Sequence, residues 1–395
     1  MTDLLVTEDD VRAYLDSIGL LGSIGGRSGA VTVREVTAGN MNRVFLAHGQ
    51  DAPAPGRGIA VKQAPPWVQA AGPSWPIDPA RIGAEARAYE RLSVVAPEVV
   101  PRIMHADLDR WVLVMEDLSD LAVLRDALVA QVAAVVEGRA PAQLDVRSTS
   151  IAVGRFVGAL TAATAGLSGA ERDRLIEESA NPELCALTVD VVLTEPYGPH
   201  EHNSWHPHLD PRVRALHADS EVGAAVAVAR QRFDAAQEAL LHGDLHTGSV
   251  MVGVRGGAWT TKVFDPEFSF VGPVGMDLGL YWANLAIAAT AAEAVGATEL
   301  AAEREAGIAA SWKAFTAELA TAERLPLDLD RIRDDAWRFA AVEAIRRVAG
   351  YSHAADLERL PRHLVGPASA AVFDRARAWL LTARDPGPDL PRLES

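Results

Sequence analysis

Short apolar segments separated by turns characterise the first third of the chain. Segments rich in Val and Ile, with Gly, Pro and Asn between them, predict β-strands at residues 31–36, 43–47, 59–64 and 111–115. A helical pattern at 82–92 lies between the third and the fourth strand. Several strands with one inserted helix do not alternate as βαβ units do. The pattern therefore favours a small lobe of the α+β class, built on an antiparallel sheet.

The hydrophobic pattern changes after residue 117, where long Ala-rich stretches with helical periodicity begin. They predict helices at about 120–138, 147–168, 183–193, 221–240, 273–295, 299–322 and 330–349. Two β-like pieces, 249–254 and 261–264, have two glycines in the turn between them and predict a hairpin. We expect a bilobal α+β fold, with a small antiparallel-sheet N-terminal lobe at 1–117 and a larger, mainly helical C-terminal lobe at 118–395.

Composition narrows the range of partners. The 395 residues include 37 Lys and Arg against 53 Asp and Glu, which gives a net charge of −16. A surface this acidic repels nucleic-acid phosphates and anionic lipids, so we expect no nucleic acid and no membrane as partner. The single cysteine, Cys185, excludes an internal disulfide and a Cys-rich metal site. The acidic start does not resemble a signal peptide and no apolar stretch is long enough to span a bilayer, which indicates a cytoplasmic protein.

The strongest chemical signal is a pair of acidic loops. The first reads HGDLHTGS at 242–249 and contains Asp244, and the second contains Asp265 and, two residues later, Glu267. In phosphoryl transfer one carboxylate accepts the proton of the attacking hydroxyl and another holds Mg²⁺ on the nucleotide phosphates. Each aspartate alone also suits a helix cap or a turn, but a turn does not require the second acid at Glu267. We therefore interpret Asp244 as the base and Asp265 as a metal ligand.

Two features of the N-terminal lobe suit nucleotide phosphates. Lys62 lies at the end of the third predicted strand, where a lysine reaches the α- and β-phosphates if a glutamate of the next helix holds it. Glu85 and Glu90 are the candidates, and we prefer Glu85; otherwise Lys62 is a surface lysine of an edge strand. Gly39 either lets its loop approach the phosphates or only forms a hairpin turn. Asn40 either donates to a phosphate or caps that turn.

Two further segments each leave two interpretations open. Met115, Glu116 and Asp117 lie at the end of the N-terminal lobe. They either present backbone groups to adenine or form a charged linker. Trp75 lies in a stiff loop that either closes over a bound sugar or packs within its lobe.

Adjacent arginines, Arg346 and Arg347, lie within a late helical pattern. Neighbouring helical positions point about 100° apart, so both side chains rarely share one environment. Either they bind oxygens of a substrate or the charge that develops during transfer, or one of them pairs with Glu343 on a solvated face. A histidine-rich segment at 200–208 is typical of a polar loop, with metal binding as the alternative.

Several stretches carry more information together than any single motif. They are HGDLHTGS (242–249), VFDPEFSFVGPVGMDLG (263–279), AGNMNRVF (38–45), VKQAPPWV (61–68), GPSWP (72–76), VMEDLSDL (114–121), NPELCALT (181–188) and EAIRRVAGYSHAADLE (343–358). From about residue 35 to about 360 the chain resembles the 5-methylthioribose kinase family, in the aminoglycoside-phosphotransferase and protein-kinase-like superfamily.

The resemblance implies a bilobal protein-kinase-like fold of the α+β class and a role for each candidate residue. It implies that Asp244 is the catalytic base and that Asp265 and Glu267 bind Mg²⁺. It further implies ATP contacts by Lys62, Asn40 and the adenine segment Met115 to Asp117, and sugar contacts by Arg346, Arg347 and the loop around Trp75. The implied reaction transfers the γ-phosphoryl group of ATP to the 1-hydroxyl of 5-methylthioribose, a step in methionine salvage, and the family is typically homodimeric.

Two positions bear on the choice of substrate. Aminoglycoside and choline kinases resemble this chain but usually carry Asn where Ser249 stands, so Glu267 is expected to supply more of the metal shell here. Arg346 and Arg347 would repel a cationic aminoglycoside or choline, but not a neutral thiosugar. The alternatives are a kinase of the same fold that acts on another sugar, an aminoglycoside or an amino alcohol, and a pseudokinase that binds nucleotide without turnover.

Overall fold

The computed structural model describes residues 4–24, 31–36, 41–49, 58–70, 72–322 and 325–385. Gly39 and Asn40 lie outside these described residues. Contacts divide the chain into two compact units. One comprises residues 1–122 and 262–267, and the other comprises 123–261 and 268–395. The sequence-based boundary after residue 117 stays a prediction.

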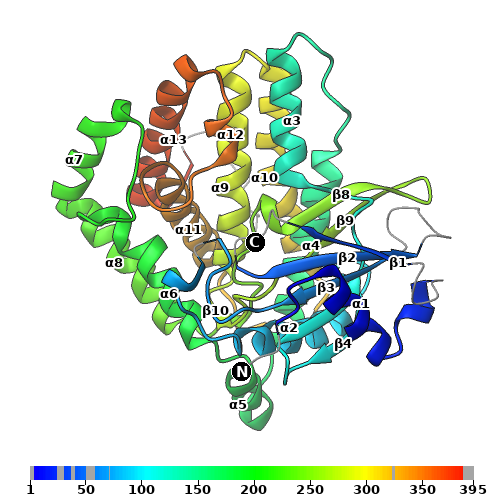
Figure 1. Cartoon of the computed structure of the whole chain (residues 1–395). Helices are drawn as coiled ribbons and strands as arrows, with labels where there is room; N and C mark the ends of the chain where they lie inside the picture. Colours follow the sequence, from blue (N-terminus) through cyan, green and yellow to red (C-terminus); the bar gives the residue numbers. More distant parts are fainter. Residues whose placement is uncertain are drawn as a thin grey trace. The chain divides into compact units, whose positions relative to one another are not determined.

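An antiparallel sheet forms the centre of the first unit (Figure 1). Its strands are β1 (Val31–Val36), β2 (Arg43–Gly49), β3 (Ile59–Gln63), β4 (Ile103–Asp107) and β5 (Val112–Glu116), in the order β1-β2-β3-β5-β4. Four of the five were predicted within two residues at each end. Strand β4 was missed because its residues IMHAD do not alternate between buried and exposed, and a bulge separates Ile103 from His105.

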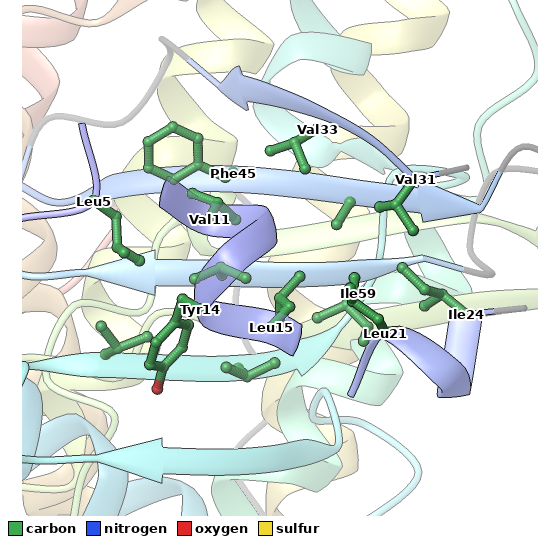
Figure 2. Packing of buried hydrophobic residues seen from close by; sticks show 14 residues of the cluster. Leu5, Val11, Tyr14, Leu15, Leu21, Ile24, Val31, Val33, Phe45 and Ile59 are labelled. Atoms are coloured by element: carbon green, nitrogen blue, oxygen red, sulfur yellow. The ribbon is translucent and has the colours of Figure 1, made fainter. Parts of the chain in front are cut away.

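The sheet register fixes the direction of Lys62. Lys62 lies opposite Val44 of β2 and Leu113 of β5, so it is in the middle of the sheet and not on an edge. Its neighbour Val61 belongs to the apolar cluster under helix α1 (Glu8–Ser17). Figure 2 shows Val11 and Leu15 of that helix packed towards the strands. Because successive side chains of a strand point to opposite faces, Lys62 points to the other face.

Helix α2 (Arg81–Val95) brings Glu85 to Lys62. The helix contains several alanines and keeps most of its first three turns buried, including Ile82, Glu85 and Tyr89. Glu90 lies one position beyond Tyr89 and is exposed. Helical periodicity therefore directs Glu85 towards Lys62 and Glu90 towards solvent, which decides between the two candidates from the sequence.

The second unit is mainly helical, as predicted. Its helices are α3 (Leu124–Val136), α4 (Val146–Thr164), α5 (Gly169–Glu178), α6 (Pro182–Leu193), α7 (Asp210–Ala218), α8 (Ser220–Ala235), α9 (Gly275–Ala294), α10 (Thr298–Leu319), α11 (Leu329–Ala349), α12 (Ala355–Glu358) and α13 (Arg362–Thr382). The predicted hairpin is formed by β8 (Val250–Arg255) and β9 (Ala258–Val263). Two short strands, β7 (Ala239–Leu240) and β10 (Val271–Gly272), pair with each other. In the sequence, β7 precedes the hairpin and β10 follows it.

Helix α9 is the core of this unit and is buried over nearly its whole length. Its sequence is apolar on all sides, which is typical of a helix surrounded by others. Glycines at positions 275 and 279 let α11 approach closely, since a Cβ at either would collide with the backbone of that helix. Trp282 of α9 packs edge-on against Trp312 of α10 and lies 4.8 Å from the ring of Trp337 on α11. No helix among the described residues has the length and apolar character that crossing a membrane would take.

Candidate active site

Lys62 forms a buried ion pair in the first unit. Only 6% of the residue is exposed, and its Nζ lies 2.7 Å from Oε2 of Glu85. It also contacts the carboxylate of Asp265. The surface-lysine alternative is wrong, because a lysine buried between two carboxylates is held in one direction.

Asp265 has an uncommon backbone conformation. Its φ is +69°, in the left-handed region that residues other than glycine rarely adopt. Its backbone N–H donates to the hydroxyl of Tyr89 at 2.9 Å, and 39% of its side chain is exposed. Strained backbone that the surrounding structure maintains is found mostly at functional sites. The conformation thus supports the interpretation of Asp265 as a functional carboxylate.

Glu267 is held by a chain of polar contacts that the sequence did not predict. Nδ2 of Asn42 donates to Oε2 of Glu267 at 2.6 Å, and Nη2 of Arg81 donates to Oδ1 of Asn42 at 3.0 Å. Burial and the charge of Asp265 raise the pKa of Glu267 to about 7, against the opposing effect of Lys62. Asn42 follows Asn40 in the AGNMN stretch, which was the available signal for its role.

Three carboxylates of the first unit are close enough to share a cation. Glu85, Asp265 and Glu267 each offer an oxygen within 4.8 Å of the other two. Burial, more than the attraction of Lys62 can offset, raises the pKa of Glu85 to about 8. Crowded carboxylates of this kind gain stability from a positive ion, and oxygen ligands suit Mg²⁺. The residues therefore fit a magnesium ion.

The segment Met115 to Asp117 is tied into the sheet. Met115 is a buried residue of β5, and the backbone N–H of Glu116 donates to the carbonyl oxygen of Arg102 at 2.8 Å. The side chain of Asp117 is buried and lies 2.9 Å from Nε2 of His48. It also accepts from the backbone N–H of Ser119 at 2.8 Å. The charged-linker alternative is wrong for Asp117, whose carboxylate has a structural role. The adenine-binding role of the backbone stays a prediction.

Trp75 lies in a closed loop of the first unit. Its carbonyl oxygen accepts from the backbone N–H of Val68 at 2.9 Å, and its own N–H donates to the carbonyl oxygen of Gly72 at 3.1 Å. The side chain is half-buried. These hydrogen bonds fix the loop, and the contact of Trp75 with a sugar stays a prediction.

In the second unit, a buried aspartate anchors the loop that carries Asp244. Oδ2 of Asp277 accepts from the backbone N–H of His242 at 2.7 Å, and its Oδ1 accepts from that of Gly243 at 2.9 Å. Gly243 has φ +86°, and a Cβ there would collide with the carbonyl oxygen of Phe268. Only glycine fits this turn. The sequence analysis missed Asp277, although it stands in the quoted stretch 263–279.

Asp244 lies in a positive environment within this loop. Oδ2 of Asp244 is 3.5 Å from Nε2 of His246, and 34% of its side chain is exposed. Burial opposes ionisation, but His246, Arg346 and Arg347 outweigh it and lower the pKa of Asp244 below its ordinary value. The carboxylate is thus ionised at neutral pH and ready to accept a hydrogen bond from an alcohol.

Ser249 stabilises the same loop. Its Oγ donates to the carbonyl oxygen of Asp244 at 2.9 Å. Because this hydroxyl donates to backbone, the contact gives no support to a role for Ser249 as a metal ligand. The hydrogen bond closes the turn between Asp244 and β8.

One glutamate holds both adjacent arginines. Nη2 of Arg346 donates to Oε2 of Glu343 at 2.6 Å, and Nε of Arg347 donates to Oε1 of the same carboxylate at 2.7 Å. All three residues are buried. The alternative of a pair on a solvated face is therefore wrong, and so is the expectation that the two side chains do not share an environment. Spacings of three and four on a helix let one carboxylate bridge both guanidinium groups.

An apolar cavity of about 100 Å³ lies beside Asp244 in the second unit. Its polar side chains are those of Thr188, Asp244, Glu343 and Arg346. The rest of the wall is largely apolar and includes Leu187, Val191, Val192, Phe233, Phe268, Met276, Leu280 and Phe339. Such a cavity accepts a small apolar group attached to a polar one.

Comparisons with known proteins place the chain in a family. The profile of the phosphotransferase enzyme family (APH) matches residues 33–313. A methylthioribose kinase of Geobacillus kaustophilus is 35% identical over 343 residues, which are 82% of this chain and 80% of that protein. The chain belongs to this phosphotransferase family, in its methylthioribose kinase branch. The resemblance inferred from the sequence motifs is thereby confirmed.

Other methylthioribose kinases agree with this placement. The enzyme of Bacillus cereus is 34% identical over 351 residues, covering 84% of this chain and 81% of its own length. The enzyme of Bacillus pumilus is 32% identical over 370 residues, which are 90% of this chain and 87% of that protein. Family membership makes the chain a phosphotransferase with an alcohol group as acceptor and a member of the kinase-like fold class.

Proposed function

We propose that this protein transfers the γ-phosphoryl group of ATP to the 1-hydroxyl of 5-methylthioribose. The observation that carries the proposal is the position of Asp244, an ionised carboxylate beside Arg346 at the end of an apolar cavity. The printed names of the relatives support the same substrate.

Asp244 acts on the acceptor. Its carboxylate accepts a hydrogen bond from the 1-hydroxyl and takes the proton as the oxygen bonds to the γ-phosphorus and the bond to ADP breaks. Arg346 and Arg347 are fixed by Glu343, so they offer their remaining N–H groups to sugar oxygens without reorganising.

The first unit supplies the groups for the nucleotide. Lys62, directed by Glu85, contacts the α- and β-phosphates, and Gly39 and Asn40 contact the phosphates from their loop. Asp265 and Glu267 hold Mg²⁺, which neutralises phosphate charge when it is bound. Met115, Glu116 and Asp117 present backbone groups to adenine, and Trp75 covers the sugar.

The cavity explains the choice of sugar. A methylthio group is small, apolar and uncharged, so it matches a lining of Leu, Val, Phe and Met side chains. An aminoglycoside or an amino alcohol would bring a cation close to Arg346 and Arg347, which costs free energy in a buried site. In a cell, this activity places the protein in methionine salvage, and we propose that it works in the cytoplasm as a homodimer.

A release assay for ADP, run with purified protein, ATP and Mg²⁺, tests this function. Candidate acceptors are 5-methylthioribose, ribose, glucosamine, choline and kanamycin. We expect turnover with 5-methylthioribose, and a loss of about a thousandfold or more in Asp244→Asn. Turnover only with a cationic acceptor would refute the substrate, and ATP binding without any phosphorylated product would indicate a pseudokinase.

A further inference from the structure

A second cluster of potential ligands lies in the segment that follows α6 and is separate from Asp244. Glu195 begins a short helical turn, Glu195–Tyr197, and His200 and His202 follow it. One atom from each of these three side chains lies within 4.8 Å of the other two. Nδ1 of His202 is 3.1 Å from Oε1 of Glu195, and Nδ1 of His200 is 3.5 Å from its Oε2.

We propose that Glu195, His200 and His202 bind a divalent transition-metal ion of the Zn²⁺ class. Imidazole nitrogens with one carboxylate suit Zn²⁺, Ni²⁺ or Cu²⁺, whereas Mg²⁺ and Ca²⁺ prefer oxygen ligands alone. Three protein ligands leave one position of a tetrahedral ion open to water. The chemistry therefore differs from that of the all-carboxylate group around Asp265.

The spacing of the ligand atoms matches such an ion. Zinc–nitrogen and zinc–oxygen bonds of about 2.1 Å at tetrahedral angles put neighbouring ligand atoms roughly 3.4 Å apart. The observed separations of 3.1 and 3.5 Å from the carboxylate of Glu195 are close to this value. On binding, Nδ1 of His200 exchanges the hydrogen bond that it accepts from the backbone N–H of His202, at 3.3 Å, for the metal bond. His202 binds the ion through Nδ1 as a neutral imidazole, so its ring proton is then on Nε2.

The backbone around the cluster is already ordered. Nδ2 of Asn203 donates to the carbonyl oxygen of Glu195 at 2.6 Å and to that of Gly198 at 2.9 Å, which closes the turn between the ligands. The side chain of Glu195 is only 9% exposed, while His200 and His202 are open to solvent on one side. A buried anionic ligand with two accessible imidazoles can capture an ion from solution.

The site also has a structural consequence for helix α11. The ring of His202 lies 5.8 Å from that of Tyr351, just beyond the end of α11, and the turn Glu195–Tyr197 contacts α11 itself. A bound ion would hold this segment against the end of the helix that carries Arg346 and Arg347. We therefore expect metal binding to raise the thermal unfolding midpoint.

Zinc titration of the tag-free, chelator-treated full-length protein tests the proposal, with a chromophoric chelator as competitor. We expect one equivalent of Zn²⁺ in the wild type, and dissociation constants raised at least about tenfold in Glu195→Gln and in His200→Ala/His202→Ala. The matched control is His206→Ala/His208→Ala, which removes two histidines of the same segment outside the cluster and should keep the equivalent.

Co²⁺ absorption and thermal unfolding without metal complete the test. Co²⁺ at a tetrahedral nitrogen and oxygen site gives visible bands, which should be present in the wild type and in the control but absent from His200→Ala/His202→Ala. Unfolding midpoints without metal show whether each variant is folded. The proposal is overturned if the wild type binds no more Zn²⁺ than His200→Ala/His202→Ala. It is also overturned if both histidine pairs lower binding equally, since the segment would then bind metal without a defined site.

Discussion

The carboxylate of Asp277 accepts the backbone N–H of His242 at 2.7 Å, 35 residues away along the chain. With the second bond from Gly243, this contact holds the turn that precedes Asp244. Burial raises the pKa of Asp277 to about 7, while the two backbone donors lower it. Because both of these backbone donors belong to the loop that carries Asp244, we interpret Asp277 as a positioning residue.

Asp277→Asn is expected to lower kcat about tenfold to a hundredfold. The amide offers one acceptor oxygen, so one of the two backbone donors faces an NH₂ group, and an unsatisfied buried donor costs about 1–3 kcal/mol. The KM for ATP should change little, because the nucleotide groups lie on other residues. Steady-state kinetics with both substrates varied measure this split.

Asp234→Asn is the control for that experiment, since Asp234 is exposed on α8 and forms an ion pair with Arg230 on the same helix. Its kinetics should equal those of the wild type. If Asp277→Asn keeps the wild-type kcat while its unfolding midpoint falls, Asp277 contributes to stability alone and the positioning role is wrong.

Two glutamates on α2 allow a matched test of the lysine pair. Glu85→Gln replaces the carboxylate that directs the charged Lys62, and a hydrogen bond to a charged group contributes about 1.5–3 kcal/mol. We expect kcat/KM for ATP to fall about tenfold to a hundredfold. Glu90→Gln changes an exposed side chain on the same helix and should leave kcat/KM unaltered. Equal effects of the two substitutions would contradict the assignment.

Much of this site was predictable from the sequence, because its residues stand in short contiguous motifs. Asp244, Asp265, Glu267 and Lys62 each stand within three residues of an apolar run, although residues 239–240 before Asp244 form the short strand β7 and not the end of the helix predicted at 221–240. The distinction between Glu85 and Glu90 was weakly predictable, since it depends on the rotation of one helix about its axis.

The rest required packing information. Asn42 acts through Glu267, 225 residues away, and local periodicity carries no signal for such a contact. Glu343 was considered as a surface partner of one arginine, whereas burial of α11 on most sides makes it the partner of both. Helix α13 was missed because Pro367 stands inside it and breaks the helical pattern.

Glu343 should make stability depend on acid pH. Burial opposes ionisation, but Arg346 and Arg347 lower the pKa of Glu343 to about 2. An unfolded glutamate titrates near 4.3, so the stabilisation is complete above that pH and is lost as the pH falls towards 2. The shift corresponds to about 3 kcal/mol of unfolding free energy.

Urea unfolding of the wild type and Glu343→Gln between pH 5.5 and 3.5 measures this contribution. The difference in unfolding free energy should narrow as the pH decreases, because below about pH 4.3 the unfolded wild type binds a proton at Glu343 that the folded protein does not bind, whereas the variant has no carboxylate there. Glu303→Gln, at an exposed position of α10, should follow the wild type at every pH. A difference that stays constant over this range would contradict the lowered pKa.

The apolar cavity predicts a change in substrate preference when it is filled. Val191 lines the cavity, and Val191→Phe adds volume there without adding charge. We expect the KM for 5-methylthioribose to rise about tenfold, since displacement of a small apolar group costs about 1–3 kcal/mol, whereas turnover of ribose, which lacks that group, should change much less. Val189→Phe on the same helix, outside the residues that line the cavity, is the control. If Val191→Phe raises the KM values for both sugars equally, the cavity does not hold the methylthio group.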